Sequence, residues 1–222
     1  MTICADKVTA PQYFKEHTGL DDKYIVKNIG IYDNENEVDF DSLLKRFVLK
    51  SNWGSWRQII VMDKGTVDKK EIIKTISTWN NITTNHYYNG FEYRYKNIKP
   101  KIVCEEFITF DYKIEFFCFD GKPVYFWTIF NDKTDDVCAN FYDAISLKKI
   151  YLRQGYPNIS RVIEIPKEYN EMFNIACKLS EGFPFVRIDF FKTQDGYKFL
   201  EMTFYHFIIG VDLRNLNQNP LI

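Results

Sequence analysis

Residues 185–204 read FVRIDFFKTQDGYKFLEMTF, two runs of β-branched and aromatic residues around Gln194-Asp195-Gly196. Runs of this kind on either side of a glycine-containing turn predict a β-hairpin. A three-residue turn, with Gly196 in the left-handed position, is typical of such hairpins. Because side chains alternate along a strand, this turn would place Asp189 opposite Glu201 on one face of the hairpin.

The same alternation places Arg187 opposite Thr203, and the charges of this hairpin then have two interpretations. Two adjacent carboxylates repel each other unless a cation lies between them. One or two carboxylates, completed by substrate phosphates, are a usual environment of Mg²⁺ in proteins. Alternatively, Arg187 and Lys198 neutralise the two acids on a solvated face of the sheet. The spacing alone leaves both interpretations open.

Outward from this hairpin, the chain alternates between strand-like and helix-like segments. Strands are expected at 25–32, 47–50, 58–62 and 101–104, and a hairpin is expected at 112–130 with its turn at Asp120-Gly121. Three helices are expected: one over 6–18, interrupted at Pro11, one that begins at Asp68, and one after Pro166. Most connections between strands are therefore hairpins. This order predicts antiparallel sheets with helices on one face, an α+β architecture.

The composition excludes several classes of protein. The 222 residues are 45% hydrophobic and 27% charged with a net charge of −1, which is ordinary for a globular protein and does not predict a nucleic-acid surface. No apolar stretch is long enough to span a bilayer and no signal pattern is present at the start, so we expect a cytoplasmic protein. The five cysteines and three histidines show no ligand spacing, which predicts free thiols and no histidine metal site.

Residues 47–61 read FVLKSNWGSWRQIIV, a strand, a short polar loop and a second strand. The lysine that ends the first strand, Lys50, is followed by a loop of the size that cradles phosphate. This loop carries two tryptophans, Trp53 and Trp56, and a single glycine, Gly54. Fewer glycines mean fewer positions at which the backbone can adopt positive φ and approach a phosphate.

Several further motifs follow in a fixed order: Asp6-Lys7, FVLK, YKNIKPKIVCEE (95–106), DYKIEFFCFDGKP (111–123), NFYD (140–143), GYPN (155–158) and FPFVRID (183–189). This ordered set resembles the TupA-like ATP-grasp family, named for teichuronopeptide biosynthesis, from Asp6 to about Thr203. The resemblance implies a single ATP-grasp domain over 1–222 with a nucleotide cleft between two lobes of mostly antiparallel sheet with helices. The small lobe, with the phosphate loop, would occupy about 35–105, and the large lobe, with the metal site, about 106–222.

The resemblance also implies roles for individual residues. ATP would be bound by Lys7, Lys50, Asn52, Gly54, Ser55 and the hinge residues Glu105, Glu106, Phe107 and Ile108. We expect Arg57 to supply a phosphate contact that backbone amides supply in relatives, because Trp56 replaces a glycine. Lys113 would approach the transferred phosphoryl group and Arg187 the developing acyl phosphate. Mg²⁺ would be held by Asp189, Glu201 and Thr203, whose hydroxyl stands where relatives have asparagine.

The activity implied is that of an ATP-dependent carboxylate–amine ligase working through an acyl phosphate, with ATP and Mg²⁺ as cofactors. The family points to capsule or cell-surface polysaccharide biosynthesis, with a uronic-acid sugar, nucleotide-linked or polymeric, as the acid and an amine or amino acid as its partner. The chain has little sequence before Asp6, which predicts a homodimer, a partner protein or an open acceptor site. Two alternatives stay open: a catalytically impaired nucleotide-binding relative, and a glycosyltransferase or sugar-binding protein of the same pathway.

Overall fold

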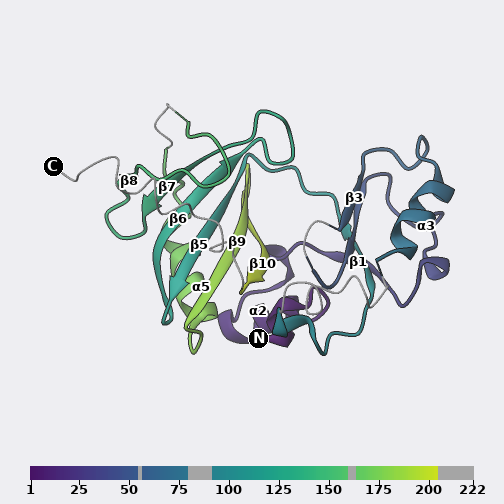
Figure 1. Ribbon diagram of the computed structural model, residues 1–222, viewed down its shortest axis with the longest axis horizontal. Coiled ribbons are helices and arrows are strands. Elements are labelled where there is room, and N and C mark those ends of the chain that lie inside the picture. Colours follow the sequence, from purple (N-terminus) through teal and green to yellow (C-terminus); the bar gives the residue numbers. More distant parts are fainter. Residues whose placement is uncertain (55–56, 80–91, 160–163, 205–222) are drawn as a thin grey trace.

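The computed structural model describes residues 1–54, 57–79, 92–159 and 164–204 of the chain (Figure 1). The strands of these residues form two antiparallel sheets, a small one in the order β1-β4-β2-β3 and a large one in the order β10-β9-β5-β6-β7-β8. The helices are few and lie against the sheets (Figure 1). The α+β class predicted from the sequence is confirmed.

The small sheet is built from four short strands: β1 (Asn28–Tyr32), β2 (Phe47–Ser51), β3 (Gln58–Val61) and β4 (Ile102–Glu106). Helix α3 (Lys69–Ser77) covers one face. It begins after Asp68, whose side chain accepts hydrogen bonds from the backbone amides of Lys70 and Glu71, as the sequence predicted. Ile72 and Ile76 of α3 are buried against Phe47, Leu49, Ile102 and Cys104 of the strands.

The opposite face of the small sheet carries Lys50 and Glu105. Lys50 pairs with Val103 and Val48 pairs with Glu105 between β2 and β4. Since neighbouring residues of a strand point to opposite faces, Lys50 and Glu105 lie together on the face that α3 does not cover. The two charged side chains therefore lie on one face of the small sheet, and the apolar core with α3 lies on the other.

The large sheet is built from six strands: β5 (Tyr112–Phe119), β6 (Lys122–Phe130), β7 (Cys138–Asp143), β8 (Lys149–Ile150), β9 (Phe185–Thr193) and β10 (Gly196–Thr203). Helix α5 (Tyr169–Ser180) packs on one face of β5, β6 and β9, and α2 (Ala10–Thr18) packs against α5. Phe116 of β5, fully buried, has edge-on or tilted ring contacts with Tyr169 and Phe173 of α5. The other face of the sheet carries a second apolar cluster, which includes Phe117 and Trp127, and charged residues lie beside it.

The hairpin between β5 and β6 turns at Asp120-Gly121. Both residues have positive φ, 47° for Asp120 and 77° for Gly121. This is the backbone that an Asp-Gly pair predicts, because a two-residue hairpin turn needs φ above zero at both positions. The sequence prediction is confirmed here residue by residue.

The hairpin between β9 and β10 has the predicted pairing of residues, but its turn is shorter than predicted. Thr193 pairs directly with Gly196, so the turn has two residues and not three. A β-bulge at Leu200 then adds the missing residue, and beyond it Asp189 pairs with Glu201 and Arg187 with Thr203. The predicted turn was therefore wrong, and the bulge restores the predicted register.

The N-terminal segment also differs from its prediction. A single helix was expected over 6–18, but the structure has α1 (Thr2–Ala5) and α2 (Ala10–Thr18), with Asp6-Lys7 in the break between them. Pro11 lies in the first turn of α2, where a missing backbone N–H costs nothing. The break places Lys7 outside a helix, free to reach the sheets.

The predicted division into lobes at about residues 35–105 and 106–222 stays a prediction. β1, which precedes residue 35, pairs with β4 in the small sheet. Across the described ranges, no helix has both the length and the apolar character needed to cross a membrane.

Candidate functional site

One face of the large sheet carries a buried cluster of charged side chains. Asp189 on β9 pairs with Glu115 on β5 and with Glu201 on β10, so three carboxylates lie side by side across the sheet. Arg187 donates two hydrogen bonds to Asp189, from Nε to Oδ1 at 2.7 Å and from Nη2 to Oδ2 at 2.6 Å. Its Nε also lies 2.9 Å from Oε2 of Glu115. Arg187 therefore holds two of the three carboxylates in place.

The burial of this cluster decides its electrostatics. The side chains of Asp189 and Glu115 are only 1% and 4% exposed. Burial by itself lowers the pKa of Arg187, but Asp189 and Glu115 more than offset this and raise that pKa above its ordinary value. Arg187 therefore stays charged, and the indole Nε1 of Trp127 donates a further hydrogen bond of 2.6 Å to Oε2 of Glu115.

The sequence offered a solvated face neutralised by Arg187 and Lys198 as one interpretation of these acids. Arg187 does neutralise Asp189, but the face is buried. Lys198 lies elsewhere: its Nζ donates to the backbone oxygen of Ile25 at 3.3 Å and lies 3.8 Å from Oε1 of Glu106. A simple surface pairing of charges therefore does not describe this hairpin.

Glu201 is the carboxylate on which cations from different elements act together. Its Oε2 lies 3.7 Å from Nζ of Lys7, and its side chain is 36% exposed. Burial would raise the pKa of Glu201, but Lys7, Lys50, Arg187 and Lys113 together lower it to about 2. These four cations come from the break after α1 and from β2, β9 and β5, so both sheets contribute to one charged site.

Lys50 and Glu105 form the charged pair of the small sheet. Nζ of Lys50 donates to Oε2 of Glu105 at 2.5 Å, and the two side chains are 10% and 9% exposed. Charge-assisted hydrogen bonds of this kind are about twice as strong as neutral ones. Glu105, which was predicted to contact ATP, therefore fixes the position of a predicted phosphate-binding lysine.

Lys7 is held by the loop after β2. Its backbone N–H donates to the carbonyl of Asn52 at 3.3 Å, and its Nζ donates to the carbonyl of Gly54 at 3.2 Å. Gly54 has a φ of 81°, a conformation that glycine adopts without strain. The Asp-Lys motif and the predicted phosphate loop thus lie in contact, although 46 residues separate Asp6 from Asn52.

The side chain of Asn52 is fully buried and forms three hydrogen bonds within the protein. Its Nδ2 donates to Oδ1 of Asp6 at 3.0 Å and to the carbonyl of Lys99 at 3.0 Å, and its Oδ1 accepts from the backbone of Lys101 at 2.7 Å. An amide with this many internal partners has little capacity left for a ligand. Asn52, predicted to contact ATP, is placed where it positions Lys7.

Replacing Asn52 with alanine should therefore lower the free energy of unfolding by about 2–4 kcal/mol, because it leaves buried polar partners without hydrogen bonds. Urea denaturation of the purified protein measures this change. Asn36→Ala, at an exposed asparagine, is the control and should change stability by less than about 0.5 kcal/mol. Equal effects of the two substitutions would contradict the positioning role of Asn52.

Lys113 lies on β5 next to the carboxylate cluster, as predicted. Its Nζ lies 2.6 Å from Oδ2 of Asp132, and both side chains are largely buried. Burial lowers the pKa of Lys113, but Glu115, Asp132 and Glu201 raise it above its ordinary value overall. Lys113 is thus a charged group at the same site as Arg187.

Arg57 points toward the end of α3 and not toward the lysines. Its Nη1 donates to the carbonyl of Trp79 at 3.3 Å, the same acceptor that the buried indole of Trp53 uses at 3.1 Å. Burial lowers the pKa of Arg57. The predicted phosphate contact of Arg57 stays a prediction, and Ser55 and Trp56 lie outside the described residues.

Of the remaining hinge residues, Glu106 ends β4, and Phe107 and Ile108 follow it. Glu106 accepts a hydrogen bond of 3.1 Å from the backbone of Lys27, opposite in direction to Glu105. Phe107 and Ile108 are half-buried, and the guanidinium of Arg46 lies 5.2 Å from the centre of the Phe107 ring. Residues 107 and 108 are thus partly accessible to solvent. The predicted contacts of this segment with adenine stay predictions.

The oxygen donors of Asp189, Glu201 and Thr203 fit Mg²⁺, a cation that takes one or two carboxylates together with phosphate and water oxygens. Burial raises the pKa of Asp189 against the opposing effect of Arg187, and Glu115 and Glu201 add to the rise. A further cation would therefore offset negative charge at this point. Within the described part of the chain, no three acidic, cysteine or histidine side chains surround a common metal position, so the predicted magnesium site stays a prediction.

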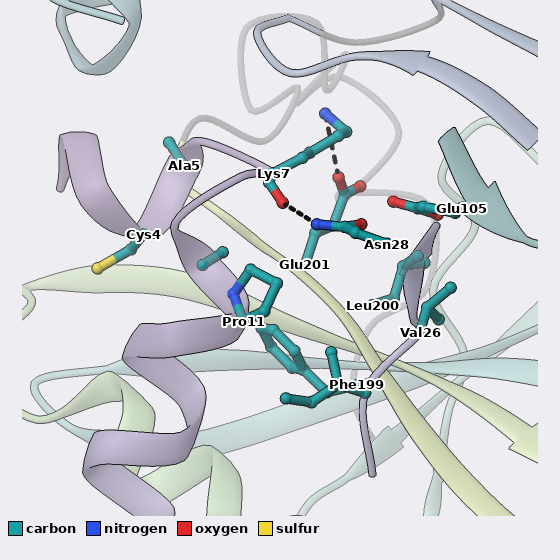
Figure 2. A pocket seen from close by; sticks show the side chains of 12 residues that line it. Cys4, Ala5, Lys7, Pro11, Val26, Asn28, Glu105, Phe199, Leu200 and Glu201 are labelled. Carbon is teal, nitrogen blue, oxygen red and sulfur yellow. Dashed lines mark hydrogen bonds and ion pairs between the residues drawn. The ribbon is translucent and has the colours of Figure 1, made fainter. Parts of the chain in front are cut away.

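Figure 2 shows the recess where the N-terminal segment, β1, β4 and β10 meet. Lys7 and Glu201 face each other above it, and Nδ2 of Asn28 donates to the carbonyl of Lys7 at 3.4 Å. Its free volume, about 10 Å³, has room for one water molecule. Asn28 therefore joins the small sheet to the segment that carries Lys7.

Two acidic residues of the site, Glu115 and Asp132, were missed by the sequence analysis. Glu115 could have been found, because it lies two residues after Lys113 and strand alternation places both on one face. Asp132 follows β6 in a loop, where no periodicity predicts the direction of a side chain.

Comparisons with known proteins agree with this geometry. The sequence pattern of the TupA-like ATPgrasp family matches residues 1–211. A search of curated proteins finds no match to the chain.

Several solved structures have a similar fold, among them three ligases or synthetases. They are a D-alanine–D-alanine ligase from Bacillus anthracis complexed with ATP (TM-score 0.52, 19% identity, 91% of this chain and 55% of that one), the ATP-grasp ligase PsnB complexed with minimal precursor (0.51, 13%, 96% and 55%) and the ADP complex of purK, an N5-carboxyaminoimidazole ribonucleotide synthetase (0.56, 13%, 94% and 47%). The chain spans about half the length of these proteins. At such identities the likeness shows the fold, and the predicted ATP-grasp architecture is confirmed.

Proposed function

Because the chain belongs to the TupA-like ATP-grasp family, we propose that it is an ATP-dependent ligase that joins a carboxylate to an amine. The observation that carries this proposal is that Lys7 is paired with Glu201 of the large sheet at 3.7 Å, while Lys50 of the small sheet and Arg187 of the large sheet act on the same carboxylate. A site to which both sheets contribute lysine and arginine side chains is suited to a ligand of high negative charge, such as a nucleoside triphosphate. Positioning and charge neutralisation are the main contributions of protein to phosphoryl transfer.

We assign the phosphates of ATP to Lys7 and Lys50, whose ammonium groups are compact charges suited to phosphate oxygens. A substrate carboxylate oxygen would attack the terminal phosphorus, ADP would leave, and the product is an acyl phosphate. The amine then attacks the acyl carbon, inorganic phosphate leaves, and the amine loses a proton. Lys113 and Arg187 would stabilise the negative charge that these steps place on phosphoryl and acyl oxygens. When bound, Mg²⁺ neutralises phosphate charge.

We further propose that the acid is a uronic-acid sugar and the amine an amino acid, in the assembly of a cell-surface polysaccharide. The half-buried rings beyond Arg187 on the same face support a sugar. Phe185 pairs with Phe119 across β9 and β5, their ring centroids lie 5.1 Å apart, and Tyr125 lies next to Phe119 at 6.1 Å. Aromatic rings carry a large apolar area, and half-buried rings would be suited to contact the apolar side of a sugar ring.

A nucleotide-binding relative without turnover is the second candidate. It is favoured by Arg187, which occupies both oxygens of Asp189, one of the proposed metal ligands. A sugar-binding protein without ATP has less support, because the tryptophans of the described ranges, Trp53, Trp79 and Trp127, are all buried.

The deciding experiment titrates the wild-type protein with a non-hydrolysable ATP analogue and millimolar Mg²⁺ by calorimetry. ADP release is then measured with uronic acids and amino acids in all combinations. Binding with turnover supports the ligase, and binding without turnover in any combination supports the second candidate. Glu201→Gln serves as the matched variant and should abolish turnover. Failure of the wild type to bind the analogue would refute both candidates.

A further inference from the structure

Arg187 contacts two carboxylates and a hydroxyl at the same time. Its Nε lies 2.7 Å from Oδ1 of Asp189 and 2.9 Å from Oε2 of Glu115. Its Nη2 donates to Oδ2 of Asp189 at 2.6 Å and to the hydroxyl of Thr203 at 3.4 Å. Asp189 and Thr203 are two of the three residues predicted to hold Mg²⁺. The guanidinium therefore occupies oxygens that a metal ion would need.

The charge of Arg187 is a second obstacle to a metal ion at Asp189. The side chains of Arg187 and Asp189 are 12% and 1% exposed, and like charges repel most strongly where little water screens them. An Asp189 that had Arg187 as its partner and no other acid nearby would be neutralised and would attract a cation weakly. A further negative charge beside Arg187 would restore the attraction.

Glu115 supplies that charge from the neighbouring strand. It pairs with Asp189 between β5 and β9, and its Oε2 faces the same Nε of Arg187 that Asp189 uses. With both acids ionised, the three side chains carry one positive and two negative charges. One negative charge is thus left over at this point of the sheet, where a divalent cation can use it.

Glu115 itself is closed to a ligand. Its side chain is 4% exposed, and the indole Nε1 of Trp127 donates to its Oε2 at 2.6 Å. Trp127 is buried in an apolar cluster with Phe117 and Phe141. Glu201, by contrast, is 36% exposed. Because Glu115 cannot reach a ligand directly, it acts on the site through Arg187.

We propose that Glu115 is a positioning residue that makes Asp189 available to the divalent cation of the nucleotide. When the cation binds Asp189, Arg187 gives up hydrogen bonds to that carboxylate and keeps its contact with Glu115, which Trp127 holds in place. The inference rests on the proposed function and deepens it. It explains how a site in which Arg187 occupies Asp189 can still take a metal ion.

Nucleotide binding by Glu115→Gln, with and without Mg²⁺, tests the proposal. A non-hydrolysable ATP analogue is titrated by calorimetry in millimolar Mg²⁺ and again in EDTA, and the ratio of the two affinities is the Mg²⁺ enhancement. Glu115→Gln should lower this enhancement roughly 10-fold, the effect of losing one charged hydrogen bond, because the guanidinium then stays on Asp189. An enhancement as large as that of the wild type would overturn the proposal.

Glu168→Gln is the matched control, the same substitution at another largely buried glutamate. Glu168 directly precedes α5, on the opposite face of the large sheet, and its Oε2 lies 3.9 Å from Nζ of Lys192. Its side chain is 14% exposed. The Mg²⁺ enhancement of this variant should equal that of the wild type, even if its stability falls. A loss as large as that in Glu115→Gln would overturn the specific role of Glu115.

Trp127→Phe is a second variant, which provides the test if Glu115→Gln does not fold. It keeps the charges of Glu115 and Arg187 and removes the hydrogen bond that fixes Glu115. The Mg²⁺ enhancement should fall, but by less than in Glu115→Gln, and an unchanged value would contradict the positioning role. A wild type that does not bind the analogue with Mg²⁺ would refute the proposed function itself. A wild type whose Mg²⁺ enhancement is shared by both variants refutes only this inference.

Discussion

Arg187→Met should lower the free energy of unfolding by about 3–5 kcal/mol, the usual effect of removing one partner from a buried ion pair. The substitution leaves the carboxylates of Asp189 and Glu115 without their cation, and their side chains are 1% and 4% exposed. A domain of ordinary stability has about 5–15 kcal/mol in total. The variant should therefore unfold at much lower denaturant concentration, or fail to fold at 37 °C.

Urea denaturation followed by circular dichroism measures this effect. Arg153→Met, at an exposed arginine, is the control and should stay within about 0.5 kcal/mol of the wild type. Adding Glu115→Gln to Arg187→Met should recover part of the stability, because it removes one of the two uncompensated charges. If Arg187→Met were as stable as the Arg153 variant, the buried cluster would not hold β5 and β9 together as described.

The charged cluster could be predicted only in part, and the hairpin of β9 and β10 shows why. Strand alternation is a local property, so it correctly placed Asp189 with Glu201 and Arg187 with Thr203. The bulge at Leu200 is not local, because it depends on how β10 packs against the rest of the sheet. The predicted pairing was right because a two-residue turn and one extra residue sum to the same register as a three-residue turn.

The parts of the site that the sequence did not predict depend on contacts between segments that are far apart in the chain. The resemblance to the family assigned Asn52 to ATP, and its partners Asp6, Lys99 and Lys101 become visible only in the folded chain. The resemblance to a family identified the motifs along the chain. Which of their residues can face a ligand, and which hold other residues in place, is decided by the packing of the folded chain.

Lys50→Met should abolish measurable binding of the ATP analogue and also lower the free energy of unfolding by about 3 kcal/mol. The second effect arises from Glu105, whose side chain is 9% exposed and loses the hydrogen bond of 2.5 Å from Lys50. A loss of activity in this variant alone would therefore be ambiguous, because an unfolded protein also binds no nucleotide. The stability cost and the binding role have to be measured separately.

The double variant Lys50→Met with Glu105→Gln separates them. Neutralising Glu105 removes the uncompensated charge, so most of the stability should return in urea denaturation, whereas nucleotide binding should stay at least on the order of 100-fold weaker than in the wild type. Lys45→Met is the matched control. Lys45 lies just before β2 and pairs with Asp63 at 3.1 Å, but its side chain is 76% exposed. Breaking that surface pair should cost less than about 1 kcal/mol and leave binding intact. Recovery of nucleotide binding together with stability in the double variant would mean that Lys50 serves only to hold β2 against β4, and the phosphate role would pass to the other lysines of the site.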